Sequence, residues 1–142
     1  MTWAITKRWV HPNNWDGTAE NSQVRKAEVI INGISDGSDE LADDILVDIS
    51  GLQGMTGQEC KKTSIEYMSW DITGLTTFQV DFDRSPKERI AVLSGQGNED
   101  FSCNPLSDSG EEGDGTGDII ATSTGAAAND TFMLRLIFRV KE

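Results

Sequence analysis

The sequence has few of the residues on which catalytic and metal sites depend. Its 142 residues include one histidine, His11, and two cysteines, Cys60 and Cys103. The cysteines have neither CxxC spacing nor a histidine nearby, which argues against zinc, and we expect free thiols rather than a disulfide. No GxSxG, Walker-type GxxxxGK[ST] or HExxH motif occurs. We therefore predict that the protein is not an enzyme and has no catalytic residue, cofactor or bound metal ion.

Long apolar runs and excess positive charge are also missing. No uncharged run approaches the roughly 20 apolar residues that span a bilayer, and the first segment, MTWAITKRWVHP, has no signal-peptide core. The chain has 12 Lys and Arg against 24 Asp and Glu, a formal net charge of -12. That charge repels nucleic acid and anionic lipid. We expect neither as a partner, and we expect synthesis in a cytoplasm.

The dominant pattern that is present is alternation with a period of two. Residues 130–140 place Arg135 and Arg139 on one face and five apolar side chains on the other: Phe132, Leu134, Leu136, Phe138 and Val140. Similar runs lie at 3–10, 27–32, 45–49, 62–72, 77–83, 89–93 and 118–123, separated by clusters of Gly, Asn, Asp, Ser and Pro. The sequence therefore predicts one all-β domain over 1–142, a β-sandwich or jelly roll of about eight short antiparallel strands.

Two glycine-rich segments resemble phosphate loops in composition only. Residues 95–100 read GQGNED and residues 113–118 read GDGTGD. Neither has GxGxxG spacing before a helix, and their acidic side chains repel phosphate. We interpret both as turns.

Carboxylates have a structural and a functional interpretation. Asp81 and Asp83 share one strand face, as paired glycosidase acids can, but we favour a solvated face beside Arg84 and Lys87. Acidic residues also gather in two loops, at 36–44 and 108–118. Such loops can hold Ca²⁺, although neither follows EF-hand order and solvated charge is the favoured interpretation.

The first 16 residues are rich in tryptophan. Trp3, Trp9 and Trp15 are interleaved with the cations Lys7 and Arg8. One interpretation is a core strand followed by an anchoring turn. The other is a docking arm over residues 1–16 that inserts tryptophans into a neighbouring subunit, because Trp and Arg dominate interface energetics. On the second interpretation these five residues bind the partner; an exposed carbohydrate platform is a third.

The second half of the chain resembles a group of small virion structural proteins of tailed phages, often marine ones. The residues that carry the resemblance are RIAVLSGQGNEDFS at 89–102 and GTGDIIATSTGAAANDTFMLRLIFRVKE at 115–142. Within them the matching features are Val92 to Gly95, Gly115 to Ile120, and the turn at 122–126. The segment from Ile65 to Phe82, with Trp70, Gly74 and a Phe-x-Val-x-Phe run, also fits.

The resemblance implies a non-enzymatic part of a phage particle, made in a bacterial host. A capsid decoration, or cement, protein agrees best with the small acidic domain, and its partner would be the major capsid protein at the capsid surface. Arg135 and Arg139 would then pair with acidic groups of that partner. We expect a homo-oligomer, a trimer or a dimer. A tail, neck or fibre subunit is the alternative within the virion, and a carbohydrate-binding module is the alternative of another class.

Overall fold

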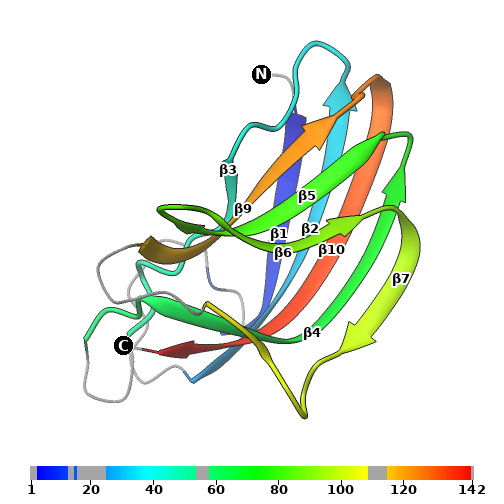
Figure 1. Ribbon diagram of the computed structural model, residues 1–142. Helices are drawn as coiled ribbons and strands as arrows, with labels where there is room; N and C mark the ends of the chain where they lie inside the picture. Colours follow the sequence, from blue (N-terminus) through cyan, green and yellow to red (C-terminus); the bar gives the residue numbers. More distant parts are fainter. Residues whose placement is uncertain (1–2, 13–14, 16–24, 54–57, 109–114, 142) are drawn as a thin grey trace.

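The computed structural model describes residues 3–12, 15, 25–53, 58–108 and 115–141. In these ranges the chain forms β-strands and no helix (Figure 1). The strands are β1 (Trp3–His11), β2 (Lys26–Asp36), β3 (Asp44–Val47), β4 (Lys62–Thr73), β5 (Thr77–Arg84), β6 (Glu88–Leu93), β7 (Gly95–Asp100), β8 (Leu106–Ser107), β9 (Gly115–Thr124) and β10 (Ala128–Lys141). Every pair of neighbouring strands is antiparallel.

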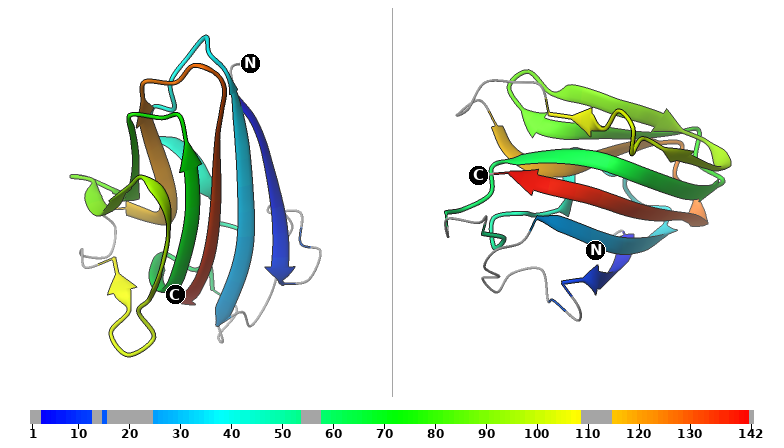
Figure 2. Two further views of the ribbon diagram at one scale, coloured as in Figure 1. Left: turned by 90° about the vertical axis from the view of Figure 1, so that its right-hand side faces the viewer. Right: turned by 90° about the horizontal axis from the view of Figure 1, so that it is seen from below.

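Two sheets pack face to face as a sandwich. The large sheet has the order β1-β2-β10-β4-β7, with β8 beside β4, and the small sheet has the order β3-β9-β5-β6. Figure 2 shows β1, β2, β10 and β4 side by side in one view and the layers from below in the other. This arrangement confirms the prediction of an all-β sandwich.

The core lies between the sheets, and β10 supplies the centre of it. Phe132, Leu134, Leu136 and Phe138 are at most 2% exposed. They face the alternating apolar residues of β5, and the rings of Phe78 and Phe132 lie 4.7 Å apart. Burying such a side chain contributes about 1.5–3 kcal/mol. The alternation read from the sequence is therefore the alternation that builds the core.

The prediction that GQGNED is a turn is wrong. Residues Gly95–Asp100 form β7, which pairs with β4 from Ile72 to Tyr67. Backbone hydrogen bonding holds this strand, and Gly97 lets the indole of Trp70 lie against it: a Cβ there would come within 2.4 Å of Trp70 Cζ2. The described part of GDGTGD, from Gly115, likewise belongs to a strand, β9, because β5 pairs with it. Residues 113–114 lie outside the described ranges.

Candidate interaction surface

The outward face of the large sheet carries apolar side chains that the core does not use. Ile30 and Ile34 of β2 point away from the buried residues Val29 and Ile31, and Ile34 is 52% exposed. Met133 and Ile137 of β10 do the same on the neighbouring strand and are half-buried. We call these four residues, with Arg8 and Arg135, the outer face. Strand pairing places Arg8, Ile30 and Arg135 in one row across β1, β2 and β10.

Arg135 is fixed in the middle of this face. Its Nη2 lies 2.6 Å from Glu28 Oε2 on β2, and Nε donates to the same oxygen at 2.8 Å. Its guanidinium also lies 5.7 Å from the ring centre of Tyr67 on β4, a cation–π distance. The outward orientation predicted for Arg135 is therefore present, but this arginine already has a carboxylate partner within the chain.

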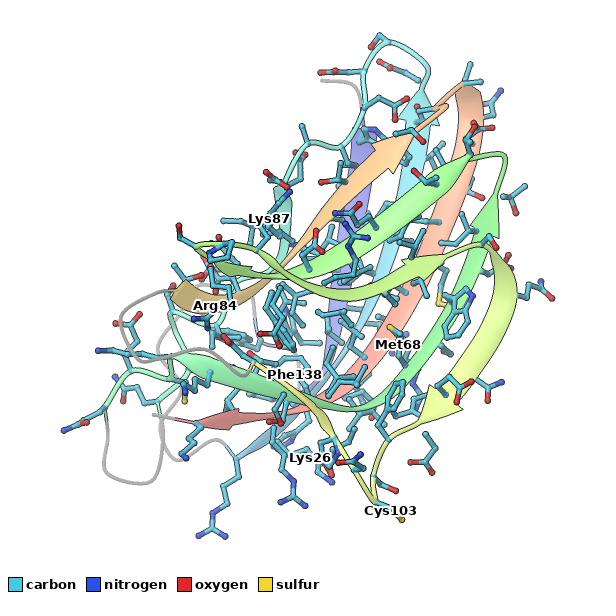
Figure 3. The ribbon with its side chains drawn as sticks, viewed as in Figure 1. Lys26, Met68, Arg84, Lys87, Cys103 and Phe138 are labelled. Carbon is cyan, nitrogen blue, oxygen red and sulfur yellow. The ribbon has the colours of Figure 1, made fainter. Side chains whose placement is uncertain are left out.

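A cluster of cations lies at one end of the same sheet. Arg25 precedes β2, Lys26 begins it, and Lys62 begins β4. Arg139 and Lys141 end β10, so pairing brings all three strand ends together. We call these five residues the cationic corner; Figure 3 shows Lys26 at this end of the molecule. Arg25, Lys26 and Arg139 line a hollow of about 240 Å³.

Glu66 is the carboxylate that two of these cations share. The ammonium of Lys26 lies 2.9 Å from Glu66 Oε1, and Nε of Arg139 lies 3.2 Å from Oε2. A bulge in β4 places Glu66 on this outward side, although the residue is only 5% exposed. Contact with Lys26, and then with Arg139, lowers the pKa of Glu66 despite its desolvation. A second hollow beside it, of about 220 Å³, is lined by Lys26, Glu66, Tyr67, Asp100, Ser102 and Ile137.

The tryptophans expected to bind a partner belong to the core, which corrects the docking-arm interpretation for them. Trp3, Trp9 and Trp15 are 3%, 4% and 7% exposed. Trp9 packs edge-on against Trp15 at 4.5 Å and against Phe138 at 6.2 Å. β1 pairs along its length with β2, so this strand is built into the large sheet. These three side chains therefore fit the other interpretation, a strand whose tryptophans belong to the core. Residues 1–2, 13–14 and 16 of the proposed arm lie outside the described ranges.

The two N-terminal cations point to opposite sides of β1. Lys7 lies on the same side of β1 as the buried Trp3 and Trp9, and its ammonium donates to the carbonyl of Ile45 at 3.4 Å, so it links the edges of the two sheets. Burial lowers the pKa of Lys7, although Asp48 and Asp118 act in the opposite direction. Arg8 points outward and is exposed, in the row described above. Of the two, only Arg8 belongs to the outer face.

Asp81 is not part of a solvated strand face, which corrects that interpretation. It is 1% exposed and accepts hydrogen bonds from Arg89 Nε at 2.9 Å and from Gln79 Nε2 at 2.8 Å. Asp83 instead accepts from Thr116 Oγ1 at 3.0 Å. The bulge in β6 opposite Asp81, at Ile90, and the packing of Arg89 over the carboxylate account for the burial. The two carboxylates therefore have separate partners.

The loop at 36–44, which we call the acidic loop, uses its carboxylates to hold its own shape. Asp36 Oδ1 accepts from the Ser38 amide at 2.9 Å. Glu40 reaches across to β9 and the following turn, where it accepts from Ser123 Oγ and the Ala126 amide at 2.7 and 2.6 Å. Asp43 pairs with Lys87 at 2.8 Å. Asp36, Asp39, Asp43 and Asp44 nevertheless remain exposed.

The described ends of the second acidic segment are buried rather than solvated. Asp108 pairs with Arg84, and Asp118 Oδ1 accepts from the Ile49 amide at 2.9 Å. Burial raises the pKa of Asp118 to about 6; the Ile49 hydrogen bond opposes the shift, and the nearby Asp48 adds to it. Residues 109–114 lie outside the described ranges.

Three further features bear on chemistry. Among the described residues, no group of three or more His, Cys, Asp or Glu side chains is placed to hold a metal ion. No helix in the described ranges is long and apolar enough to cross a membrane. Cys60 is buried, Cys103 is exposed, and both are free thiols, as predicted.

Comparisons with known proteins do not assign a family. No protein-family model and no curated protein matches the chain. Among solved structures, one described as "CBM4 structure and function" is 9% identical, with a TM-score of 0.25 over 82% of this chain and 84% of that chain. The CBM3a-L domain with flanking linkers from scaffoldin cipA of the cellulosome of Clostridium thermocellum is 8% identical, with a TM-score of 0.23 over 99% and 68%. Such low TM-scores carry no argument about function.

Proposed function

We propose that this chain is a structural protein of a phage particle, and most specifically a capsid decoration protein that binds the outside of the major capsid shell and stabilises it. The resemblance of residues 89–102 and 115–142 to tailed-phage virion proteins supports the virion assignment. It does not by itself separate capsid from tail, neck or fibre.

The observation that carries the proposal is the outer face. Exposed apolar residues that gather on one side of a folded domain mark interaction sites. Here Ile30 and Ile34 lie diagonally across from Met133 and Ile137, with Arg135 between the last two and Arg8 beside Ile30 on β1. Apolar side chains, Met and Arg together form the centre of many protein interfaces. The outer face would therefore lie on the capsid, and burial there would add to the strength of the shell.

A carbohydrate-binding module is the less favoured function. Tyr67 borders the smaller hollow, and an aromatic ring in such a position could stack on a sugar ring. However, the Arg135 guanidinium already lies over the Tyr67 ring. Trp3, Trp9 and Trp15 are buried and offer no platform. Saturable glycan binding that Tyr67→Ala abolishes would reverse this preference.

Binding to expanded capsids that lack the protein tests the proposal. Ile34→Asp should weaken binding by about tenfold or more, because it places a charge in a desolvated contact. Val92→Asp is the matched control, since Val92 is 54% exposed on the outward side of the small sheet. Binding that only Val92→Asp weakens would place the contact on the other sheet, and binding only to tails would refute the decoration role.

A further inference from the structure

The edge strands of the sandwich differ in how they are protected. The large sheet ends in β1 and β7, and the small sheet ends in β3 and β6. An extra residue interrupts the pairing of three of them: Val10 in β1, Leu46 in β3 and Ile90 in β6. Such bulges are one way in which proteins prevent another chain from adding to an edge. β7 has no bulge, no proline and no lysine, and it pairs with β4 in unbroken register.

The free side of β7 presents main-chain groups to solvent. Just beyond the end of the strand, the amide of Phe101 donates to the carbonyl of Glu66 at 2.7 Å. Bonded and non-bonded positions alternate along an antiparallel pair, so the odd-numbered residues of β7 bond to β4. The amides and carbonyls of Gln96, Asn98 and Asp100 therefore point away from β4. These three residues are exposed, and no strand of the described ranges pairs on that side (Figure 1).

The side chains of β7 determine which segment can pair with it. Gly95 and Gly97 leave the backbone open to a close approach. Glu99 and Asp100, at the end of the strand, are both exposed. Charged residues on an edge repel a strand of like charge, which is another way in which proteins prevent edge-to-edge association. The same two carboxylates attract a strand that carries lysine or arginine.

We propose that β7 is the site at which a partner protein adds a basic, extended segment as a further strand of the large sheet. Main-chain hydrogen bonds to Gln96, Asn98 and Asp100 hold the segment in register. Its lysine or arginine side chains pair with Glu99 and Asp100 and give the contact its specificity. The inference does not depend on the proposed capsid function.

Other occupants fit this edge less well. A second copy of the chain brings its own acidic strand and a net charge of -12, so it is repelled. Nucleic acid is repelled for the same reason. An apolar segment finds no apolar side chain on β7 against which to bury itself, because the strand reads GQGNED. A basic segment is the occupant that the charge and the backbone of β7 both favour.

Amide hydrogen exchange of the full chain, measured by nuclear magnetic resonance with and without the blocked peptide Lys-Thr-Lys-Thr-Lys-Thr-Lys-Thr, tests the proposal. In the free protein the amides of Gln96, Asn98 and Asp100 should exchange rapidly. Saturating peptide should slow them by about tenfold or more, because they become hydrogen-bonded. The amides of Gly97 and Glu99, which bond to β4, should exchange slowly in both states.

Two variants separate strand pairing from simple charge attraction. Asn98→Pro removes an amide on the free side and keeps the bonds to β4, and an edge strand tolerates proline in such a position. It should weaken peptide binding by about tenfold or more, whereas Asn98→Ala should not. Glu99→Gln with Asp100→Asn should also weaken binding by about tenfold. The matched control, Asp39→Asn with Asp44→Asn, removes two charges from the acidic loop and should have little effect.

Several outcomes would overturn the proposal. One is a wild type that does not bind the peptide. Another is binding that Asn98→Pro leaves unchanged, which would mean that side chains attract the peptide without strand pairing. Equal weakening by the two double variants would mean that net charge alone is responsible. Dimerisation without peptide that Asn98→Pro abolishes would make a second copy the occupant of the edge.

Discussion

The guanidinium of Arg84 and the carboxylate of Asp108 form an ion pair inside the protein, with Nη1 2.5 Å from Oδ1. Their side chains are only 8% and 2% exposed. The pair joins the end of β5 to the segment that follows β8. Removing one partner leaves an uncompensated buried charge, which costs far more than removing both.

Arg84→Met should therefore lower the free energy of unfolding by about 3 kcal/mol. The double variant with Asp108→Leu should lose less than Arg84→Met alone, because no buried charge is left behind. Urea unfolding followed by tryptophan fluorescence measures both. Equal losses in the single and the double variant would show that the charge itself is not what costs stability.

Stability should change with pH between about 4 and 6 through Asp118. Its folded pKa, about 6, lies above the usual value of 3.8, so the folded chain binds more protons than the unfolded chain in this range. The contribution of this group is therefore most favourable below pH 4 and is lost as pH rises through 6. Asp118→Asn retains an acceptor for the Ile49 amide and should add about 1–2 kcal/mol at pH 7, after allowance for solvent screening. Melting temperatures across this range test it, and a wild-type profile that the substitution leaves unchanged would contradict it.

Carboxylates with lowered pKa act in a separate range. Contact with Lys26 lowers the pKa of Glu66, and contact with Lys87 lowers that of Asp43. Their stabilisation is present above the unfolded pKa values near 4 and is lost as pH falls further. Acid unfolding below pH 4 should therefore persist in the Asp118→Asn variant.

Gly97→Ala should disturb the contact between β7 and β4. The added Cβ would lie 2.4 Å from the Trp70 ring, so the indole must move and lose its hydrogen bond to the Ser94 carbonyl at 3.2 Å. We expect a loss of about 1–3 kcal/mol and a red-shifted emission from Trp70. Gln96→Ala, an exposed change in the same strand, is the control and should leave the emission unchanged. If both variants behave as the wild type does, Trp70 does not pack on Gly97.

The two thiols should differ in reactivity. Cys103 is exposed and Cys60 is buried (Figure 3 labels Cys103 in the loop that follows β7). A thiol reagent should modify one cysteine per native chain and two in denaturant. Cys103→Ser should leave no fast-reacting thiol. Fast modification of that variant would mean that the region around Cys60 opens readily.

Sequence periodicity predicted the strands whose side chains alternate, and missed those held by backbone pairing. The alternating apolar residues of Phe132 to Phe138 and of Phe78 to Phe82 indicate a buried face, so the sequence alone predicted β10 and β5. β7 could not be predicted in this way, because its inward positions include Gly95 and Gly97 and no apolar residue. We predicted a turn because glycine and acidic residues favour turns, but the backbone of these residues pairs with β4 instead.

The sequence likewise predicted some of the surface residues and missed others. Alternation was sufficient to place Arg135 and Arg139 outward. The cationic corner, by contrast, unites Lys26, Lys62 and Lys141 from three strands whose register no local pattern encodes. The cluster of tryptophans was visible, but whether Trp3, Trp9 and Trp15 face a partner or the core depended on the pairing of β1 with β2. Basic residues at strand ends were the one available signal for the corner.

The position of β10 also governs how the protein comes to be made. This strand pairs with β2 on one side and β4 on the other, yet it follows both of them in the chain. During translation, β2 and β4 leave the ribosome with no central neighbour and with their apolar faces open. Such edges are prone to aggregate, and pairing across so long a loop is slow. The large sheet can therefore be completed only after residues 128–141 have emerged, and nascent chains that stall before that point are natural clients for chaperones.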